Sequence, residues 1–157
     1  MEKDSIQVFS DRNQIDKATA DLMKKAMEAT QDAYAPYSNF FVGAAVLLDN
    51  GKVIKGSNFE NASYPLCLCA ERVALGSVHS QHPGAVVKAI AVTANNKAQD
   101  VNEPVAPCGA CRQVLFEYEQ KQGKPMRVIM FGGKGNVVIS ETAAQLLPMA
   151  FDHKFLE

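Results

Sequence analysis

The 157-residue sequence has no long apolar run and no block of like charge. No stretch approaches the ~20 consecutive apolar residues of a membrane-spanning helix, and residues 1–14 are polar and mixed in charge, unlike a secretory signal peptide. The formal net charge is −1 and the longest basic block is the pair Lys24 and Lys25, so neither a nucleic acid nor a membrane is an expected partner. We therefore expect a cytoplasmic protein.

The sequence also lacks internal repeats, low-complexity segments and an interdomain linker. Hydrophobic residues make up 47% of the chain and charged residues 21%, which are ordinary proportions for a globular protein and argue against disorder or a coiled coil. The length suits a single domain over 1–157. Residues 1–15 carry no clear pattern, and we treat them as an N-terminal extension without an assigned structure.

Apolar periodicity and turn residues predict alternating helices and strands. Residues 16–33 have helical spacing, and Pro36 ends that helix. Asn50 and Gly51 suit a tight hairpin turn between strands over 42–48 and 53–56. The remaining predicted elements are a helix from near Cys69 to 80, a strand over 86–94, a helix from near Cys108 to before Gly123, strands over 127–131 and 136–140, and a short helix over 143–147 capped by Thr142. This order predicts an α/β fold, namely a three-layer α/β/α arrangement with a mixed five-stranded sheet.

The four cysteines form two close pairs, Cys67-x-Cys69 and Cys108-x-x-Cys111. In a reducing cytoplasm such cysteines are expected to be metal ligands or nucleophiles rather than disulfides. Cys108 and Cys111 lie on one face at the start of a predicted helix, where the helix dipole stabilises thiolates, and Cys69 opens another helix in the same way. The spacing therefore predicts a zinc site.

Glu71 decides what kind of zinc site this is. A catalytic zinc has three protein ligands and one open position, whereas a structural zinc has four. Zinc deaminases carry a glutamate two residues after the first ligand and a later Pro-Cys-x-x-Cys pair. Here Cys69 precedes Glu71 by two residues, and Pro107 precedes the Cys108–Cys111 pair. We expect Glu71 to transfer protons beside a zinc-activated water.

Other interpretations of these residues remain open at this point. Cys67 could complete a four-cysteine structural zinc module that binds a partner, although a free cysteine is commonly core material. A deaminase of DNA or RNA is disfavoured by the charge and by the lack of an aromatic and basic strand-binding stretch. The three histidines, His79, His82 and His153, lie away from the motifs, and we expect them to face solvent.

Three blocks of the chain resemble the small zinc-dependent cytidine deaminases with three cysteine ligands. They are residues 38–45 (SNFFVGAA), residues 58–65 (NFENASYP) continuing into 69–72 (CAER), and residues 107–113 (PCGACRQ). The resemblance extends from Tyr34 to Phe151 and implies a cytidine-deaminase-like fold. It also implies one Zn²⁺ per subunit, a homotetramer with shared active sites, and deamination of cytidine and/or 2′-deoxycytidine in pyrimidine salvage.

The resemblance assigns roles to further residues. Asn58 and Glu60 would bind the 3′-hydroxyl of the sugar, and Arg72 would hydrogen-bond the ligand sulfurs. Phe40 would lie against the pyrimidine, and Phe151 would reach into a neighbouring subunit's site. The backbone positions implied to line the base pocket are Ala62, Ala70 and Ala106. A related deaminase of aminopyrimidine antibiotics of the blasticidin type is the alternative, and Asn58 with Glu60 argues against it.

Overall fold

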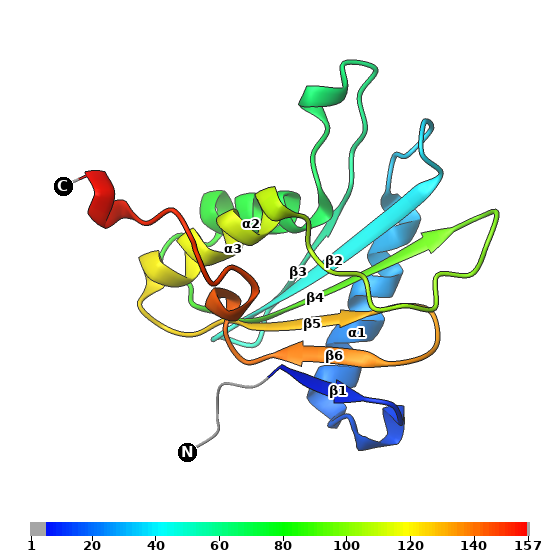
Figure 1. Ribbon diagram of the computed structural model, residues 1–157, viewed down its shortest axis with the longest axis horizontal. Helices are drawn as coiled ribbons and strands as arrows, with labels where there is room; N and C mark the ends of the chain where they lie inside the picture. Colours follow the sequence, from blue (N-terminus) through cyan, green and yellow to red (C-terminus); the bar gives the residue numbers. More distant parts are fainter. Residues whose placement is uncertain (1–5, 157) are drawn as a thin grey trace.

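The computed structural model describes residues 6–156 (Figure 1). Within that range the strands are β1 (Gln7–Phe9), β2 (Phe40–Leu48), β3 (Val53–Ser57), β4 (Val87–Asn96), β5 (Arg127–Phe131) and β6 (Val137–Ser140). The α-helices are α1 (Lys17–Ala29), α2 (Ala70–Gln81) and α3 (Gly109–Gln122), and short 3₁₀ helices cover Arg12–Gln14, Thr30–Asp32, Tyr64–Leu66, Ala143–Leu146 and His153–Leu156. None of the helices in this range is long and apolar enough to cross a membrane.

The six strands form one mixed sheet in the order β1-β6-β5-β4-β2-β3. Only β4 and β5 run parallel, and every other neighbouring pair is antiparallel. The prediction of five strands was therefore wrong by one, because Gln7–Phe9 adds β1 to the free edge of β6. β1 has three residues, and Val8 is 62% exposed, so this short edge strand has no alternating apolar pattern that could reveal it.

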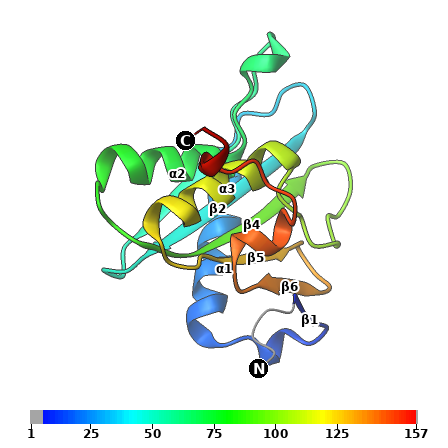
Figure 2. The same cartoon turned by 60° about the vertical axis from the view of Figure 1, so that its left-hand side comes forward.

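The helices cover both faces of the sheet, as predicted: α1 lies on one face, and α2 and α3 lie on the other (Figures 1 and 2). Successive residues of β2 show the division, since Ala44 and Val46 pack in the core cluster that contains α2 residues, while Ala45 packs against α1. Side chains of a strand alternate between faces, so a central strand covered on both faces is apolar throughout. This explains why β2 and β4 read as continuous apolar runs.

Two glycines allow the helices to approach the sheet closely. A Cβ atom on Gly43 would lie 2.1 Å from the carbonyl oxygen of Ala26 in α1, and one on Gly56 would lie 2.4 Å from the carbonyl oxygen of Ala70. A side chain at position 56 would collide with the backbone of α2. The first turn of α2 can pack directly on β3 because residue 56 is glycine. Gly56 thus sets the position of the helix that begins after Cys69.

The predicted helix ends are close to the observed ones, with two differences. The first helix ends as an α-helix at Ala29 and continues as the 3₁₀ turn Thr30–Asp32 rather than reaching residue 33. The last predicted helix is the 3₁₀ helix Ala143–Leu146, and Thr142 caps it by accepting a hydrogen bond from the amide of Ala144. A single turn is too short to gain from α-helical cooperativity, so the tighter form is favoured.

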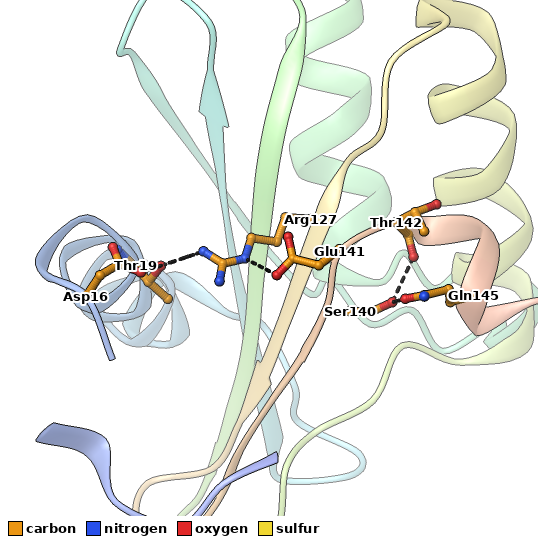
Figure 3. A network of polar contacts seen from close by, with 7 residues as sticks. All are labelled: Asp16, Thr19, Arg127, Ser140, Glu141, Thr142 and Gln145. Atoms are coloured by element: carbon orange, nitrogen blue, oxygen red, sulfur yellow. Dashed lines mark hydrogen bonds and ion pairs between the residues drawn. The ribbon is translucent and has the colours of Figure 1, made fainter. Parts of the chain in front are cut away.

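Polar side chains also join the layers (Figure 3). Asp16 caps α1 by accepting from the amide of Thr19 at 2.9 Å. Arg127 on β5 donates to the Thr19 hydroxyl at 3.0 Å and to Glu141 at 3.2 Å, while Ser140 donates to the carbonyl of Thr142. The contacts of Arg127 tie α1 to β5 and to Glu141, the residue that follows β6.

Candidate active site

The N-termini of α2 and α3 meet on the same face of the sheet (Figure 2). Cys69 is the N-cap of α2 and Cys108 is the N-cap of α3, both with extended backbone and neither side chain bonded to the helix it precedes. Cys111 lies in the first turn of α3 and is buried. The first amides of a helix have no partner within the helix and carry partial positive charge, so both termini favour thiolate side chains. The prediction that these cysteines lie at the starts of two helices is confirmed.

The sulfur atoms of Cys69, Cys108 and Cys111 all lie within 4.8 Å of one another, and those of Cys69 and Cys108 are 4.0 Å apart. Sulfur atoms bound to one tetrahedral zinc at about 2.3 Å lie about 3.8 Å from each other. The three side chains therefore fit one zinc ion with little rearrangement.

Cys67 lies outside this cluster. Within residues 6–156 the group of side chains able to share a metal contains the three other cysteines alone. The sulfur of Cys67 instead accepts a hydrogen bond from the amide of Asn61 at 3.2 Å and lies 3.7 Å from the carbonyl oxygen of the same residue. A four-cysteine structural site is not formed, so a tetrahedral zinc held by the other three cysteines would keep one position open for water.

The electrostatics of the cluster favour anionic sulfur. Hydrogen bonding from Cys111, Cys108 and Arg72, with the positive charge of Arg72, lowers the pKa of Cys69 to about 5 against the opposing effect of burial. Cys111 shares a proton with Cys69, and this pairing together with burial raises the pKa of the Cys111 thiol. Cys69 therefore favours the thiolate form, and a cation bound by the cluster would favour thiolates among its ligands.

Arg72 provides the positive charge beside the cluster. Its Nη2 donates to the carbonyl oxygen of Cys67 at 2.9 Å, while its Nε atom is buried and has no hydrogen-bond partner within the described range. Burial opposes the charged form, but hydrogen bonding to Cys69 and attraction by it still raise the pKa of Arg72. A buried, unpaired donor beside three sulfurs suits a site in which those sulfurs carry negative charge.

Glu71 is the second residue of α2, and its side chain is 4% exposed. Burial raises the pKa of its carboxyl group, and the negative charge of Cys69 raises it further. Buried carboxylates with raised pKa values are suited to exchanging protons near neutral pH.

A cavity of about 280 Å³ joins these groups to the residues predicted to bind the sugar and base. Its wall includes Cys69, Cys108 and Glu71 together with Asn58 and Glu60. Phe40 and Ala106, both predicted, also line it, and Val42, Cys67, Leu68 and Val105 complete the wall. The last four were not predicted as site residues, because apolar side chains and an unligated cysteine carry no chemical signal in a sequence.

Asn58 is fixed in orientation by strand β2. Its Oδ1 accepts from the amide of Val42 at 2.8 Å, and its Nδ2 donates to the carbonyl of Phe40 at 2.9 Å. Since an amide can only donate and a carbonyl can only accept, the two ends of the Asn58 side chain cannot be exchanged. Asn58 therefore continues the hydrogen bonding of β2 just beyond the end of β3.

Glu60 is held by the loop that precedes β2. Its Oε2 accepts from the amides of Tyr37 at 2.9 Å and Ser38 at 3.3 Å, and its Oε1 accepts from the Ser38 hydroxyl. Desolvation acts to raise the pKa of Glu60, but these hydrogen bonds outweigh it and lower the pKa. The carboxyl group of Glu60 is therefore ionised at neutral pH. The sequence did not point to Tyr37 or Ser38 as partners of Glu60, because 22 positions or more separate them.

The other predicted residues do not line the cavity. Ala70 is fully buried, and Ala62 is exposed on the segment 58–68, which projects from the body beside the loop before β2 (Figures 1 and 2). Phe151 is exposed and stacks on Phe155, and its carbonyl accepts from Gln113 of α3. Of the histidines, His79 and His153 are exposed and His82 is partly buried.

Comparison with known proteins places this geometry in a family. Residues 16–124 match the model of the cytidine and deoxycytidylate deaminase zinc-binding region. The chain is 46% identical over 130 residues to a cytidine deaminase of Halalkalibacterium halodurans, covering 83% of this chain and 91% of that protein.

Solved structures agree with this match. A cytidine deaminase from Burkholderia pseudomallei superimposes with a TM-score of 0.71 at 47% identity, covering 84% of this chain and 98% of that one. One from Mycobacterium tuberculosis gives 0.67 at 34% identity, covering 87% and 99%. Such identity over most of both chains, with the cysteine cluster in place, shows that the protein belongs to the zinc-dependent cytidine and deoxycytidylate deaminase family.

Proposed function

We propose that this protein hydrolytically deaminates free cytidine and/or 2′-deoxycytidine to the uridine nucleoside and ammonia, as a step of pyrimidine salvage in the cytoplasm. One Zn²⁺ per subunit is held by Cys69, Cys108 and Cys111. The observation that carries the proposal is a single cavity lined by Cys69 and Cys108 of the three-cysteine cluster, by the buried carboxyl group of Glu71, and by Asn58 and Glu60.

Glu71 performs the proton transfers. When bound, zinc supplies the Lewis acidity that makes water nucleophilic at neutral pH. Glu71 accepts a proton from the attacking water, delivers it to N3 of the cytosine ring, and then carries a proton to the leaving amino group. Its raised pKa makes both its charged and its neutral form accessible, and its burial keeps bulk water from competing for the proton.

Asn58 and Glu60 recognise one hydroxyl group of the sugar. After its bonds to strand β2, Asn58 keeps one N–H of Nδ2 without a partner in the described part of the chain. Glu60 keeps one acceptor position on Oε1, since the Ser38 hydroxyl takes the other. One donor and one acceptor match a single hydroxyl group, and a free base without a sugar would leave both unpaired.

The remaining residues line or tune the site. Phe40 contacts the pyrimidine ring, and the backbone of Ala62, Ala70 and Ala106 contributes to the base pocket. Arg72 offsets the negative charge of three thiolates, which would otherwise weaken the metal's effect on water. Because Ala62 is exposed in the single chain, its contact with substrate depends on how neighbouring subunits close the pocket.

The protein acts as a homotetramer with shared sites. Exposed apolar side chains gather on the projecting segment, including Tyr64 at 68% exposed and Leu66, and on the C-terminal segment, including Phe151 and Leu156. Burying such residues between subunits is favourable by about 25 cal/mol per Å² of apolar area. Phe151 is on the outside of α3, from where it reaches a neighbouring subunit's cavity rather than its own.

Purified zinc-loaded protein is incubated with cytidine, 2′-deoxycytidine, free cytosine and cytidine 5′-monophosphate, and loss of the cytosine absorbance is followed together with ammonia release. We expect turnover of one or both nucleosides, with cytosine and the nucleotide much poorer substrates. Size-exclusion chromatography with light scattering reports the subunit number. Absence of turnover with both nucleosides, in protein that contains one zinc per chain, would refute the proposal.

A further inference from the structure

The loop before β2 encloses the carboxylate of Glu60. The amides of Tyr37 and Ser38 donate to Oε2, and the Ser38 hydroxyl donates to Oε1. Three hydrogen bonds from two adjacent residues leave the Glu60 side chain one direction in which to accept another. The loop therefore determines where the carboxylate points.

Ser38 also contacts the backbone of Phe40. Its oxygen accepts from the amide of Phe40 at 3.1 Å, so one hydroxyl group donates to Glu60 and accepts from Phe40 at once. Asn39 makes this possible: its φ of 55° is the only positive value at a non-glycine residue among those described, and asparagine tolerates this left-handed conformation better than most residues. The carbonyl of Phe40 is held in turn by Asn58.

These contacts form a continuous chain from Glu60 to Asn58. Glu60 is bonded to Ser38, Ser38 to the amide of Phe40, and the carbonyl of Phe40 to Asn58. The three other members of this chain of contacts, Phe40, Asn58 and Glu60, all line the cavity that Cys69 and Cys108 also line. Ser38 itself does not line that cavity; it lines an adjoining hollow with Tyr37, Tyr64, Glu60 and Cys67.

We propose that Ser38 is a positioning residue for sugar recognition, because its hydroxyl holds the Glu60 carboxylate in the orientation that accepts the sugar hydroxyl and ties it to the backbone of Phe40. The inference rests on the proposed function, in which the substrate is a nucleoside and therefore carries a sugar hydroxyl. A serine that only stabilised an exposed turn would affect every substrate equally. A serine that acts through Glu60 affects only substrates with the hydroxyl that Glu60 contacts.

The test compares Ser38→Ala, which removes the hydroxyl, with Ser38→Thr, which keeps it. Steady-state kinetics are measured with cytidine and with 3′-deoxycytidine. A hydrogen bond to a charged group of this kind is worth about tenfold in binding. We expect Ser38→Ala to raise the KM for cytidine about tenfold with little change in kcat, because the lost interaction binds ground state and transition state alike.

The same variant should change the kinetics with 3′-deoxycytidine by less than about twofold, because the Glu60 contact is already missing there. Ser38→Thr, which keeps the hydroxyl, should have a KM for cytidine close to that of the unaltered protein. Ser80→Ala is the matched control, since the Ser80 hydroxyl bonds only to the carbonyl of Ser77 in its own helix, and it should alter neither substrate. Adding Ser38→Ala to Glu60→Gln should give little further loss with cytidine, which tests the same coupling independently.

If Ser38→Ala impaired the kinetics with both substrates equally, the proposal would be overturned in favour of a general effect on the loop. If it left the kinetics with cytidine unchanged, the Ser38 hydroxyl would have no role in sugar recognition. Either result leaves the proposed function standing if the unaltered protein turns over cytidine. Failure of the unaltered protein to do so refutes the function itself. Zinc content and the melting temperature of each variant confirm that the cluster and the fold are intact.

Discussion

The sulfur atoms of Cys69 and Cys108 lie 4.0 Å apart, although 39 positions separate the two residues in the chain. Each is the N-cap of its own helix, and the two helices pack on one face of the sheet with their N-termini meeting. The sheet thus brings together two electropositive helix ends, which is a favourable place for thiolates and for the cation that they bind.

Zinc binding should distinguish Cys67 from Cys108. Cys108→Ser should lose most of the zinc, because only two ligands remain, and serine is a good N-cap, so α3 should still begin at Gly109. Cys67→Ser should keep about one zinc per chain, since its sulfur bonds to Asn61 instead. Metal content of the purified variants measures both. Loss of zinc from Cys67→Ser would show that the fourth cysteine is a ligand after all.

Glu71→Gln should lower kcat for cytidine by about 10²–10⁴-fold, because an amide cannot carry the proton. The zinc content should stay near that of the unaltered protein, since the metal-binding cluster does not include Glu71. Glu117→Gln, on the exposed surface of α3, is a control for the charge change and should leave kcat unchanged. Near-full turnover by Glu71→Gln would exclude Glu71 as the proton carrier.

Gly56→Ala should destabilise the fold by about 1–3 kcal/mol, the usual cost of overpacking a filled core. The new methyl group would lie 2.4 Å from the Ala70 carbonyl and 2.6 Å from the Ala74 amide, so α2 must move. Because Cys69 and Glu71 are at the start of that helix, zinc affinity should fall as well. Urea denaturation and a competitive zinc titration measure the two effects.

Gly76→Ala is the matched control for that prediction. Gly76 lies in the same helix, and a methyl group there would meet nothing within 4 Å. Alanine in a helix interior is more favourable than glycine by about 0.5–1 kcal/mol, so this variant should be as stable as the unaltered protein or slightly more stable. If both alanine variants lost stability equally, close packing at Gly56 would not be the cause.

Asp16→Ala should destabilise the protein by about 1 kcal/mol at neutral pH through loss of the α1 cap. Hydrogen bonds from the side chain and the amide of Thr19, with attraction by Arg127, lower the pKa of Asp16 against a small effect of burial. A lowered folded-state pKa means that the stabilisation is full above the unfolded-state pKa, about 3.9, and is lost as the pH falls through the folded-state value.

The stability difference between the unaltered protein and Asp16→Ala should therefore shrink as the pH falls below about 4. Denaturation curves at pH 7 and across the acid range measure it. Asp21→Ala, which removes only an exposed ion pair with Lys17, should change stability by less than about 0.5 kcal/mol. A difference for Asp16→Ala that grew on acidification would contradict the assigned pKa direction.

Local spacing in the sequence was enough to predict the parts of the site that lie within one helix. Cys108 and Cys111 are three residues apart at a helix start, and helical geometry alone brings them to one face. The hairpin at Asn50 and Gly51 and the left-handed Gly123 that ends α3 likewise depend on neighbouring residues. Central strands and amphipathic helices were predictable for the same reason.

Contacts between distant segments could not be predicted from such patterns. The edge strand β1 exists because β6 offers it unpaired backbone groups, and its own three residues carry no signal. The enclosure of Glu60 by Ser38 depends on the projecting segment lying against the loop before β2.

The sequence by itself determined that three cysteines and a glutamate are available with the spacing of a zinc deaminase. Only the tertiary structure decided that Cys67 stays outside the cluster, because its sulfur is directed to Asn61 by the turn that follows Asn58. Position along a chain sets local geometry through backbone dihedrals, whereas distances between segments are set by how the sheet and helices pack.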